Sequence, residues 1–268
     1  MSYLLPKSLG YQTDFAVRAT EGSEISRKEG YWRIETPSSP TFYWGNFLLL
    51  DESLHSNGWR FATELFTDEF PNSGHIAIGY DTTSAPETSF RDFINNGIDL
   101  EETTILLAKP ESIISVRTTE AIIRPLVSEN DWSQYVELGT STRGEGFSES
   151  GYRDYLNSRV PEKRKASANG KAMWFGAFAE GQLASHLGIY DAGEGVSRYQ
   201  QIATLPTFQR NGFASDLIRV ASDYAASVFA ARRLVIAADP TYHAINLYKN
   251  LGFEIFESQV QLQRKSEQ

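Results

Sequence analysis

A glycine-containing turn at residues 209–214, with the sequence Gln-Arg-Asn-Gly-Phe-Ala, constrains this chain more than any other feature. It lies between an apolar segment, 202–205, and a long amphipathic segment. A turn that feeds a helix start leaves several backbone N–H groups unpaired at the positive end of the helix dipole, where an anion can bind. Gly212 lets the backbone approach a ligand, and the small Ala214 leaves room beside it. The pattern predicts a strand, an anion-binding turn and a helix, although a plain strand-turn-helix would explain Gly212 about as often.

The segment after the turn has the periodicity of a helix that packs on a sheet. Its apolar residues recur at helical spacing, with Asp216, Arg219 and Asp223 on the other side; they are Ala214, Leu217, Ile218, Ala221, Ala225 and Val228. A short apolar run, 234–238, is typical of a buried strand, and Asp239 with Pro240 ends it.

The last third of the chain predicts a further helix and a strand. Apolar residues fall on one helical stripe, which Gly252 closes at a C-cap position; they are Ala244, Leu247, Tyr248 and Leu251. Val260 and Leu262 then alternate with glutamines, which is the period of a half-buried strand.

This order of elements resembles the acetyl-CoA-binding half of GNAT acyltransferases. The family signature is Gln or Arg, two residues, Gly, one residue, then Gly or Ala, and it matches Gln209, Gly212 and Ala214. A second family element, Ala-x-x-Leu-Tyr followed by Leu-Gly-Phe, matches residues 244–253. Upstream, the resemblance covers a first strand, two helices and a central hairpin at 120–125, 131–138, 152–165, 174–179 and 183–190. It spans about residues 118–268.

The resemblance implies acetyl-CoA as the acyl donor and assigns its binding residues. Backbone N–H groups of the turn and helix start would bind the pyrophosphate, from Gln209, Arg210, Asn211, Gly212, Phe213, Ala214 and Ser215. The strand edge at Ile202, Ala203 and Thr204 would pair with the pantetheine arm as far as Pro206, which has no N–H to donate. Thr241 stands where many relatives have Asn, and its hydroxyl can cap the last helix or bond the pantetheine arm.

By the same resemblance, Tyr248 would donate a proton to the departing thiolate, because a phenol is protonated at neutral pH. The alternative is a core aromatic residue whose hydroxyl meets water. No carboxylate lies in 198–205 to act as general base, and Gln200 and Gln201 cannot accept a proton. The candidates from elsewhere are Glu145, Glu149, Glu194 and His186. Each also has a structural interpretation, as a helix-start acid or an ordinary histidine, and water can carry the proton instead.

Composition excludes several other chemistries. The four histidines show no metal-ligand spacing and there is no cysteine, so neither a metal site nor a covalent cysteine intermediate is expected. The net charge of -9 argues against nucleic acid and favours cationic acceptors such as amines. The basic run 163–165 is interpreted as a solvated helix end, and 144–150 as a flexible acceptor loop rather than a nucleophile elbow.

The N-terminal half, 1–110, predicts a second α/β unit that ends near 109–112. Its expected strands are 31–35, 42–50, 76–80 and 103–108, and its expected helices are 59–70 and 90–94. This order is compatible with a degenerate GNAT-like unit that lacks a pyrophosphate turn and binds no second coenzyme. The aromatic cluster 42–47 would form an acceptor wall or, as is favoured, core or domain-interface packing.

We therefore predict an α/β protein in which a mixed, mostly antiparallel central sheet is flanked by helices. A GNAT-like domain, 118–268, would follow a smaller α/β domain, 1–110. The expected reaction is acetyl transfer to an amine by direct attack in a ternary complex; the alternatives are a non-catalytic acyl-CoA-binding sensor and a two-domain interaction protein. The 268 residues hold no segment apolar enough to span a membrane, and 1–10 do not read as a secretory signal, so a cytoplasmic protein is expected, with an oligomer allowed.

Overall fold

The chain divides into two compact units. The computed structural model describes residues 5–40, 42–84, 90–114, 119–144, 146–241 and 244–265. Unit 1 comprises Met1–Leu106, Ala237–Ile245 and Ile255–Gln268, and unit 2 comprises Leu107–Ile236 and Asn246–Glu254. This division differs from the expected one at the C-terminus, where 255–268 group with the N-terminal half. The reason is that the last strand is built into the sheet of unit 1.

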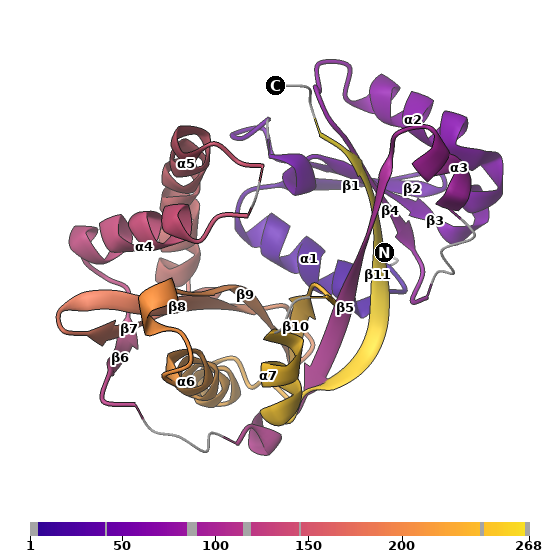
Figure 1. The fold of residues 1–268 in the computed structure, drawn as a ribbon. Helices are drawn as coiled ribbons and strands as arrows, with labels where there is room; N and C mark the ends of the chain where they lie inside the picture. Colours follow the sequence, from indigo (N-terminus) through magenta and orange to yellow (C-terminus); the bar gives the residue numbers. More distant parts are fainter. Residues whose placement is uncertain are drawn as a thin grey trace. The chain divides into compact units, whose positions relative to one another are not determined.

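Unit 1 is a mixed sheet with the strand order β1-β2-β3-β4-β11-β5 (Figure 1). β3 and β4 are parallel, β1, β2 and β3 form antiparallel pairs, and β4 pairs antiparallel with β11, with Val260 opposite Tyr80. The strands are β1 (Glu24–Lys28), β2 (Tyr31–Glu35), β3 (Phe47–Asp51), β4 (Ile76–Asp81), β5 (Asp99–Ala108) and β11 (Glu254–Arg264). The helices are α1 (Leu9–Thr20), α2 (Gly58–Glu69) and α3 (Arg91–Asn95), with short 3-10 helices η1 (Tyr43–Gly45) and η2 (Glu52–Asn57).

The core of unit 1 lies on both faces of β4, whose residues are all buried. The Tyr11 hydroxyl of α1 fills the place that a Cβ on Gly79 would take, whereas the ring of the next residue, Tyr80, lies 5.5 Å from that of Phe90. Because consecutive strand residues point to opposite faces, α1 covers one face and the segment around α3 covers the other. Burial on both faces explains the continuous apolar run of this strand.

Several expectations for unit 1 need correction. The strand expected over 42–50 begins only at Phe47, because 43–45 form η1. β11 is not half-buried, since Gln259 and Gln263 are also buried and bond the side chains of Asp14 and Glu101. Neither α1 nor β1 was expected from the sequence.

The aromatic cluster 42–47 packs into unit 1. Phe47 is 1% exposed, its ring lies 5.4 Å from that of Trp44, and the Tyr43 ring lies 4.4 Å from His75. These contacts are the core packing that the sequence favoured.

Unit 2 is a sheet with the strand order β10-β9-β8-β7-β6, antiparallel except for the parallel pair β9/β10. Figure 1 shows α4 and α5 on one face and α6 on the other. The strands are β6 (Ile122–Pro125), β7 (Ala172–Ala179), β8 (Gln182–Asp191), β9 (Val196–Thr204) and β10 (Arg233–Ala238). The helices are α4 (Glu129–Ser141), α5 (Glu149–Ala168), α6 (Phe213–Val228) and α7 (Ala244–Asn250), with short 3-10 helices η4 (Pro110–Ser112) and η5 (Pro206–Phe208).

Local sequence explains where the helices of unit 2 begin. Ser128 caps α4 in a capping box, in which the Ser128 side chain accepts from Asp131 N and the Asp131 carboxylate accepts from Ser128 N. Ser148 caps α5 by accepting from Gly151 N at 3.2 Å. All the elements expected between 120 and 263 form, most of them extended by a few residues.

Both units contain the same local arrangement of parallel strands. In unit 1, β3 is followed by η2, α2 and the parallel strand β4; in unit 2, β9 is followed by η5, α6 and the parallel strand β10. A positive-φ glycine stands at each helix start, Gly58 at +78° and Gly212 at +88°. This repetition agrees with the expectation of a second GNAT-like unit.

Candidate active site

The glycine turn forms a compact loop between η5 and α6. Arg210 has φ +64° and Gly212 has φ +88°, so the chain reverses through two left-handed residues. The side chain of Asn211 donates to Phe208 O at 3.3 Å, and that of Gln209 donates to Thr204 O at 3.4 Å. Gly212 is the N-cap of α6, a position where its positive φ costs no steric clash.

The start of α6 offers a row of free N–H groups. The first intrahelical bond runs from Asp216 N to Gly212 O at 3.0 Å, and Gly212 has no side chain to cap the helix. Within the described chain, no hydrogen bond occupies the N–H groups of Phe213, Ala214 and Ser215. Aligned with the dipole of a 16-residue helix, these groups suit an anion. The structure thus brings the predicted residues 209–215 together as one loop and helix start.

Asp216 lies in the first turn of α6 and corrects the sequence interpretation. It was assigned to the polar face, but it is 3% exposed and accepts a 2.6 Å hydrogen bond from Thr119 N. Its carboxylate therefore fastens the segment ahead of β6 to the start of α6.

The predicted pantetheine edge lies on β9 beyond its pairing with β10. The parallel register joins 196–198 to 233–235, and 199–204 continue past that paired stretch. On the other side, Ala203 pairs with His186 and Thr204 with Ser185 of β8. Residues 202–204 are half-buried. An extended ligand arm can pair with such an edge.

Tyr248 is buried on α7, with 7% of its surface exposed. Its ring lies 6.3 Å from Phe253, which in turn lies 6.1 Å from Tyr199 of β9. Gly252 makes the return from α7 possible, because at φ +102° a Cβ would lie 2.5 Å from Ser112 O. Tyr248 is therefore linked to β9 through one intervening aromatic ring.

Thr241 precedes two residues that lie outside the described ranges, after which α7 is described from Ala244. The Thr241 hydroxyl and N–H both donate to Asp239 Oδ1, at 2.6 and 2.7 Å. The residue is exposed and groups with unit 1.

The acidic candidates for a general base lie in exposed positions or outside the described residues. Glu145 is outside them. Glu149 begins α5 and lies 3.6 Å from the Arg153 guanidinium, which is the dipole and ion-pair role typical of a helix start. Glu194 is exposed in the β8–β9 turn, with φ +51°.

His186 differs from these candidates because it is buried in the interior of unit 2. It is 2% exposed on β8, with its ring 4.7 Å from that of Tyr135 and 6.1 Å from that of Trp174. Burial, to which the charge of Lys163 adds, lowers the pKa of His186 to about 3. Neither ring nitrogen has a hydrogen-bond partner among the described residues. The imidazole is therefore neutral at neutral pH and a weak base.

Lys163 is not the solvated helix end that the basic run predicted. It is 3% exposed, and its ammonium lies 4.6 Å from the centre of the Trp174 ring. The turn of α5 places Lys163 toward the sheet, where the indole face attracts a cation. Its neighbours do face solvent: Arg164 pairs with Glu129 at 2.6 Å and Lys165 with Glu162 at 3.8 Å.

Sequence reasoning missed a bulge in β9. Gln201 has φ +48°, and the β8–β9 register shifts there, so that Gln201 and Ile202 both face Leu187. The Tyr135 hydroxyl bonds Gln201 Oε1 at 2.6 Å. No sequence signal marks the bulge, because the left-handed position is not a glycine.

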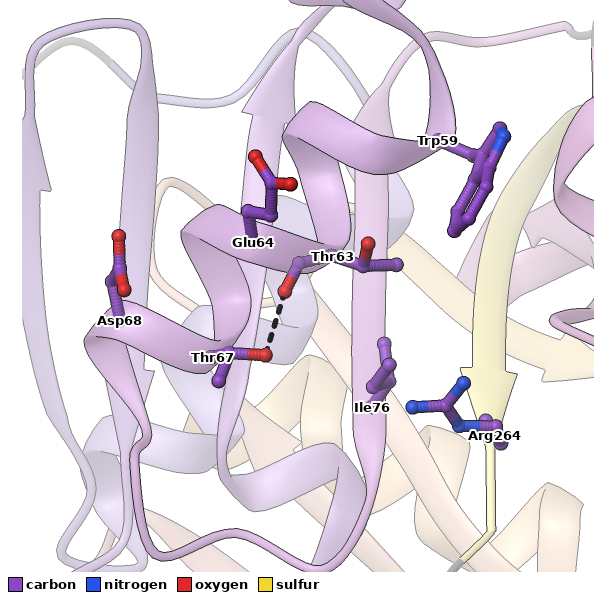
Figure 2. A pocket seen from close by; sticks show the side chains of 7 residues that line it. All are labelled: Trp59, Thr63, Glu64, Thr67, Asp68, Ile76 and Arg264. Atoms are coloured by element: carbon purple, nitrogen blue, oxygen red, sulfur yellow. Dashed lines mark hydrogen bonds between the residues drawn. The ribbon is translucent and has the colours of Figure 1, made fainter. Parts of the chain in front are cut away.

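Described residues of unit 1 line two of the hollows found on the chain. One, of about 340 Å³, opens beside α2 (Figure 2) and is lined by Trp59, Thr63, Glu64, Thr67, Asp68, Ile76 and Arg264. The other, of about 490 Å³, is lined by Leu5, Lys7, Asp51, Glu52, Ser53 and Asp81. Among the described residues, no group of three or more His, Asp or Glu side chains could hold a metal ion. None of the helices in the described ranges has the length and hydropathy of a membrane span.

Comparison with known families gives a match for the part of the chain that holds the glycine turn. Residues 132–253 match the family described as "Acetyltransferase (GNAT) family". This chain carries a GNAT-family domain. The match includes the glycine turn, α6 and the Tyr248 helix. A comparison with curated proteins gives no match.

Solved structures extend the likeness to the whole GNAT-containing chain. A functionally unknown conserved protein from Staphylococcus epidermidis has 14% identity and a TM-score of 0.71, covering 92% of this chain and 95% of its own. A GCN5-related N-acetyltransferase from Kribbella flavida has 12% identity and a TM-score of 0.68, covering 97% and 98%. A tandem GNAT protein from the clavulanic acid biosynthesis pathway has 12% identity and a TM-score of 0.57, covering 92% and 84%. The predicted mixed α/β fold, a mostly antiparallel sheet flanked by helices with a second α/β domain, is confirmed.

Proposed function

We propose that unit 2 transfers an acetyl group from acetyl-CoA to an amine, by direct attack in a ternary complex. The observation that carries this proposal is the start of α6, where Gly212 has no capping side chain and the N–H groups of 213–215 are free. A pyrophosphate fits this chemistry, because its oxygens accept hydrogen bonds from backbone N–H groups at the positive end of the helix dipole.

The proposed contacts follow the chain. Residues 209–215 bind the pyrophosphate, and Ile202, Ala203 and Thr204 pair with the pantetheine arm. When bound, acetyl-CoA supplies the thioester whose acyl group the amine attacks. Direct attack is the simplest route because the chain has no cysteine to carry the acyl group.

Proton transfer is assigned to Tyr248 and to water. The Tyr248 hydroxyl would donate to the departing thiolate. Water would take the proton from the amine, because the buried, neutral His186 is a weak base and the Glu149 carboxylate lies against Arg153. The net charge of -9 favours a cationic acceptor at the encounter stage.

Unit 1 is proposed to bind no coenzyme, although it repeats the strand, turn and helix. At its turn, Asp51 stands opposite Asp81 in the parallel register, and both line the 490 Å³ hollow together with Glu52. Glu52 already pairs with Lys7 at 2.9 Å and Asp51 with Arg27 at 2.5 Å, so the cations beside this hollow are not available to a pyrophosphate. The expected stoichiometry is one acetyl-CoA per chain.

A non-catalytic acyl-CoA sensor is the second candidate. It is favoured by the side chains along β9, where Gln200 and Gln201 stand in place of a base and Gln201 Oε1 accepts a hydrogen bond from the Tyr135 hydroxyl. Turnover separates the two: an enzyme releases free coenzyme A thiol with some amine in a panel of small amines, aminoglycosides and peptides, whereas a sensor binds acetyl-CoA without turnover.

The thermal unfolding shift with acetyl-CoA tests the site. At a hundredfold excess over Kd, binding stabilises the folded protein by about 2.7 kcal/mol, which raises Tm by several degrees. In Gly212→Glu the carboxylate should repel the pyrophosphate and abolish the shift. Gly181→Glu is the matched control, since Gly181 also has a positive φ, +78°, and open space around it. A wild-type protein with no shift would contradict the proposal.

A further inference from the structure

The bulge in β9 depends on a backbone conformation that its sequence does not favour. Gln201 adopts φ +48°, a left-handed conformation that strains any residue with a Cβ. Two residues, Gln201 and Ile202, face the single residue Leu187 of β8. Such a bulge persists only where neighbouring groups hold it.

A side chain of α4, in the helical layer that packs on the sheet, contacts Gln201. The Tyr135 hydroxyl, on α4, bonds Gln201 Oε1 at 2.6 Å. Tyr135 is 1% exposed, and its ring is fixed among those of Trp132, Trp174 and His186, with centroid distances of 5.5, 5.3 and 4.7 Å. Because the ring cannot swing away, the hydroxyl fixes the position of the Gln201 amide.

The bulge lies between the part of β9 that pairs with β10 and the predicted ligand edge. The β10 register runs through 196–198, and the edge at 202–204 follows directly after the bulge. An extra residue in a strand reverses which groups face each side, so the bulge decides which way the backbone N–H and C=O groups of 202–204 point.

We infer that Tyr135 is a positioning residue for acyl-donor binding: it holds the Gln201 bulge and thereby orients the 202–204 edge. The inference rests on the proposed function of unit 2. The proposed role of Tyr135 is to position Gln201, to which its hydroxyl donates.

Two substitutions and their combination test this role. Tyr135→Phe keeps the ring and removes the hydroxyl, so the bulge loses its hold and the affinity for acetyl-CoA, measured by isothermal titration calorimetry, should fall by about tenfold. Gln201→Gly adopts positive φ without strain and needs no hold. Adding Gln201→Gly to Tyr135→Phe should therefore restore the affinity to near the wild-type value.

Tyr31→Phe is the matched control, because Tyr31 also donates a 2.6 Å hydrogen bond to a side chain, Glu69, but lies in unit 1. Its affinity for acetyl-CoA should equal that of the wild type. Unchanged affinity in Tyr135→Phe would overturn the inference, and so would a loss that the double variant does not restore, since general destabilisation of the core would not be repaired by a glycine.

Amide hydrogen exchange separates this inference from the proposed function. A wild-type protein that binds no acetyl-CoA would overturn the proposed function and the ligand role of Tyr135. Hydrogen exchange then tests separately whether Tyr135 stabilises the Gln201 bulge. Faster exchange at residues 201–204 in Tyr135→Phe, but not in Tyr31→Phe, would support this stabilisation, and exchange equal to that of the wild type would overturn it.

Discussion

The Tyr199 hydroxyl of β9 donates a 2.8 Å hydrogen bond to the backbone carbonyl of Ile218 in α6. This bond joins the middle of β9 to α6, the helix whose start is the proposed pyrophosphate site. Both groups are buried, and burial raises the pKa of Tyr199 well above its ordinary value. The hydroxyl is therefore a donor at every working pH.

Removing this hydroxyl should destabilise unit 2 without unfolding it. Tyr199→Phe keeps the ring contact with Phe253 and loses one neutral hydrogen bond, so the free energy of unfolding should fall by about 1 kcal/mol. Urea denaturation measures the difference. Tyr224→Phe, on α6, serves as the control, because the contacts of its side chain are with the rings of Phe175 and Phe229. An equal loss in both variants would contradict the assigned contact.

His186 should make stability depend on pH between neutrality and pH 5. Its folded pKa of about 3 lies below the ordinary value near 6.5, so in this range the unfolded state binds a proton that the folded state does not. Stability is therefore lost as the pH falls, by about 2 kcal/mol between pH 7 and pH 5 for this one group.

His186→Gln removes that proton and should flatten the pH profile. Urea denaturation gives, for each protein, the change in the free energy of unfolding between pH 7 and pH 5. The difference between these two changes isolates His186, because the other titrating groups are the same in both proteins. An equal pH dependence in wild type and variant would show that the His186 imidazole takes up its proton in the folded state.

Asp131 should make the free energy of unfolding fall as the pH drops below about 4. Both Asp131 oxygens accept from Arg124, at 2.7 and 2.8 Å, and hydrogen bonding to Arg124 holds the pKa of the carboxyl well below its usual range. A depressed folded pKa adds stability that is present above pH 4 or so and is lost as the pH falls further. Since Arg124 is partly exposed, the loss in Asp131→Asn at pH 7 is expected to be about 2 kcal/mol.

Denaturant titrations of wild type and Asp131→Asn from pH 7 to pH 3 test this. The difference between them should narrow below pH 4 or so, where the wild-type carboxyl also becomes neutral. Glu137→Gln is the control, because the Glu137 carboxylate is solvent-exposed beside Arg153 and should contribute little. A difference that stays constant with pH would contradict the role of the Asp131 charge.

The glycine turn and the helix start after it were predictable because their determinants are local. Gly212 and Ala214 act through the backbone of their own loop, and the helical spacing of the apolar residues after them predicts the helix. The strands and helices of unit 2 were found for the same reason. Lys163 was misread because adjacent basic residues face different directions on a helix, and only the position of Trp174 shows which one is buried.

The remaining features depend on contacts distant in sequence. The Gln201 bulge is held by Tyr135, which is 66 residues away in the sequence. The residues around 201 contain no pattern that predicts a bulge. Likewise, the pairing of β11 with β4 draws the end of the chain into unit 1, which a reading of successive segments cannot reveal. Asp216 looked like a surface residue until the chain ahead of β6 supplied Thr119 N as its partner.

Tyr248→Phe tests the proposed proton donor. The ring would keep its place beside Phe253, 6.3 Å away, so the affinity for acetyl-CoA should not change. If the hydroxyl donates to the leaving thiolate, its loss should lower kcat by about a hundredfold, the usual contribution of a general acid. Release of free coenzyme A thiol, followed with an amine found in the screen, measures kcat, and calorimetry measures the affinity.

The control is Tyr224→Phe, at a half-buried ring on α6 packed against Phe175 and Phe229. It removes a hydroxyl from the same unit and should leave kcat within a few-fold of the wild-type value. Substitutions of partly exposed side chains away from the reacting atoms usually have small effects. A Tyr248→Phe protein with the wild-type kcat would assign Tyr248 to core packing, because only a hydroxyl that transfers a proton changes the rate while leaving the affinity intact.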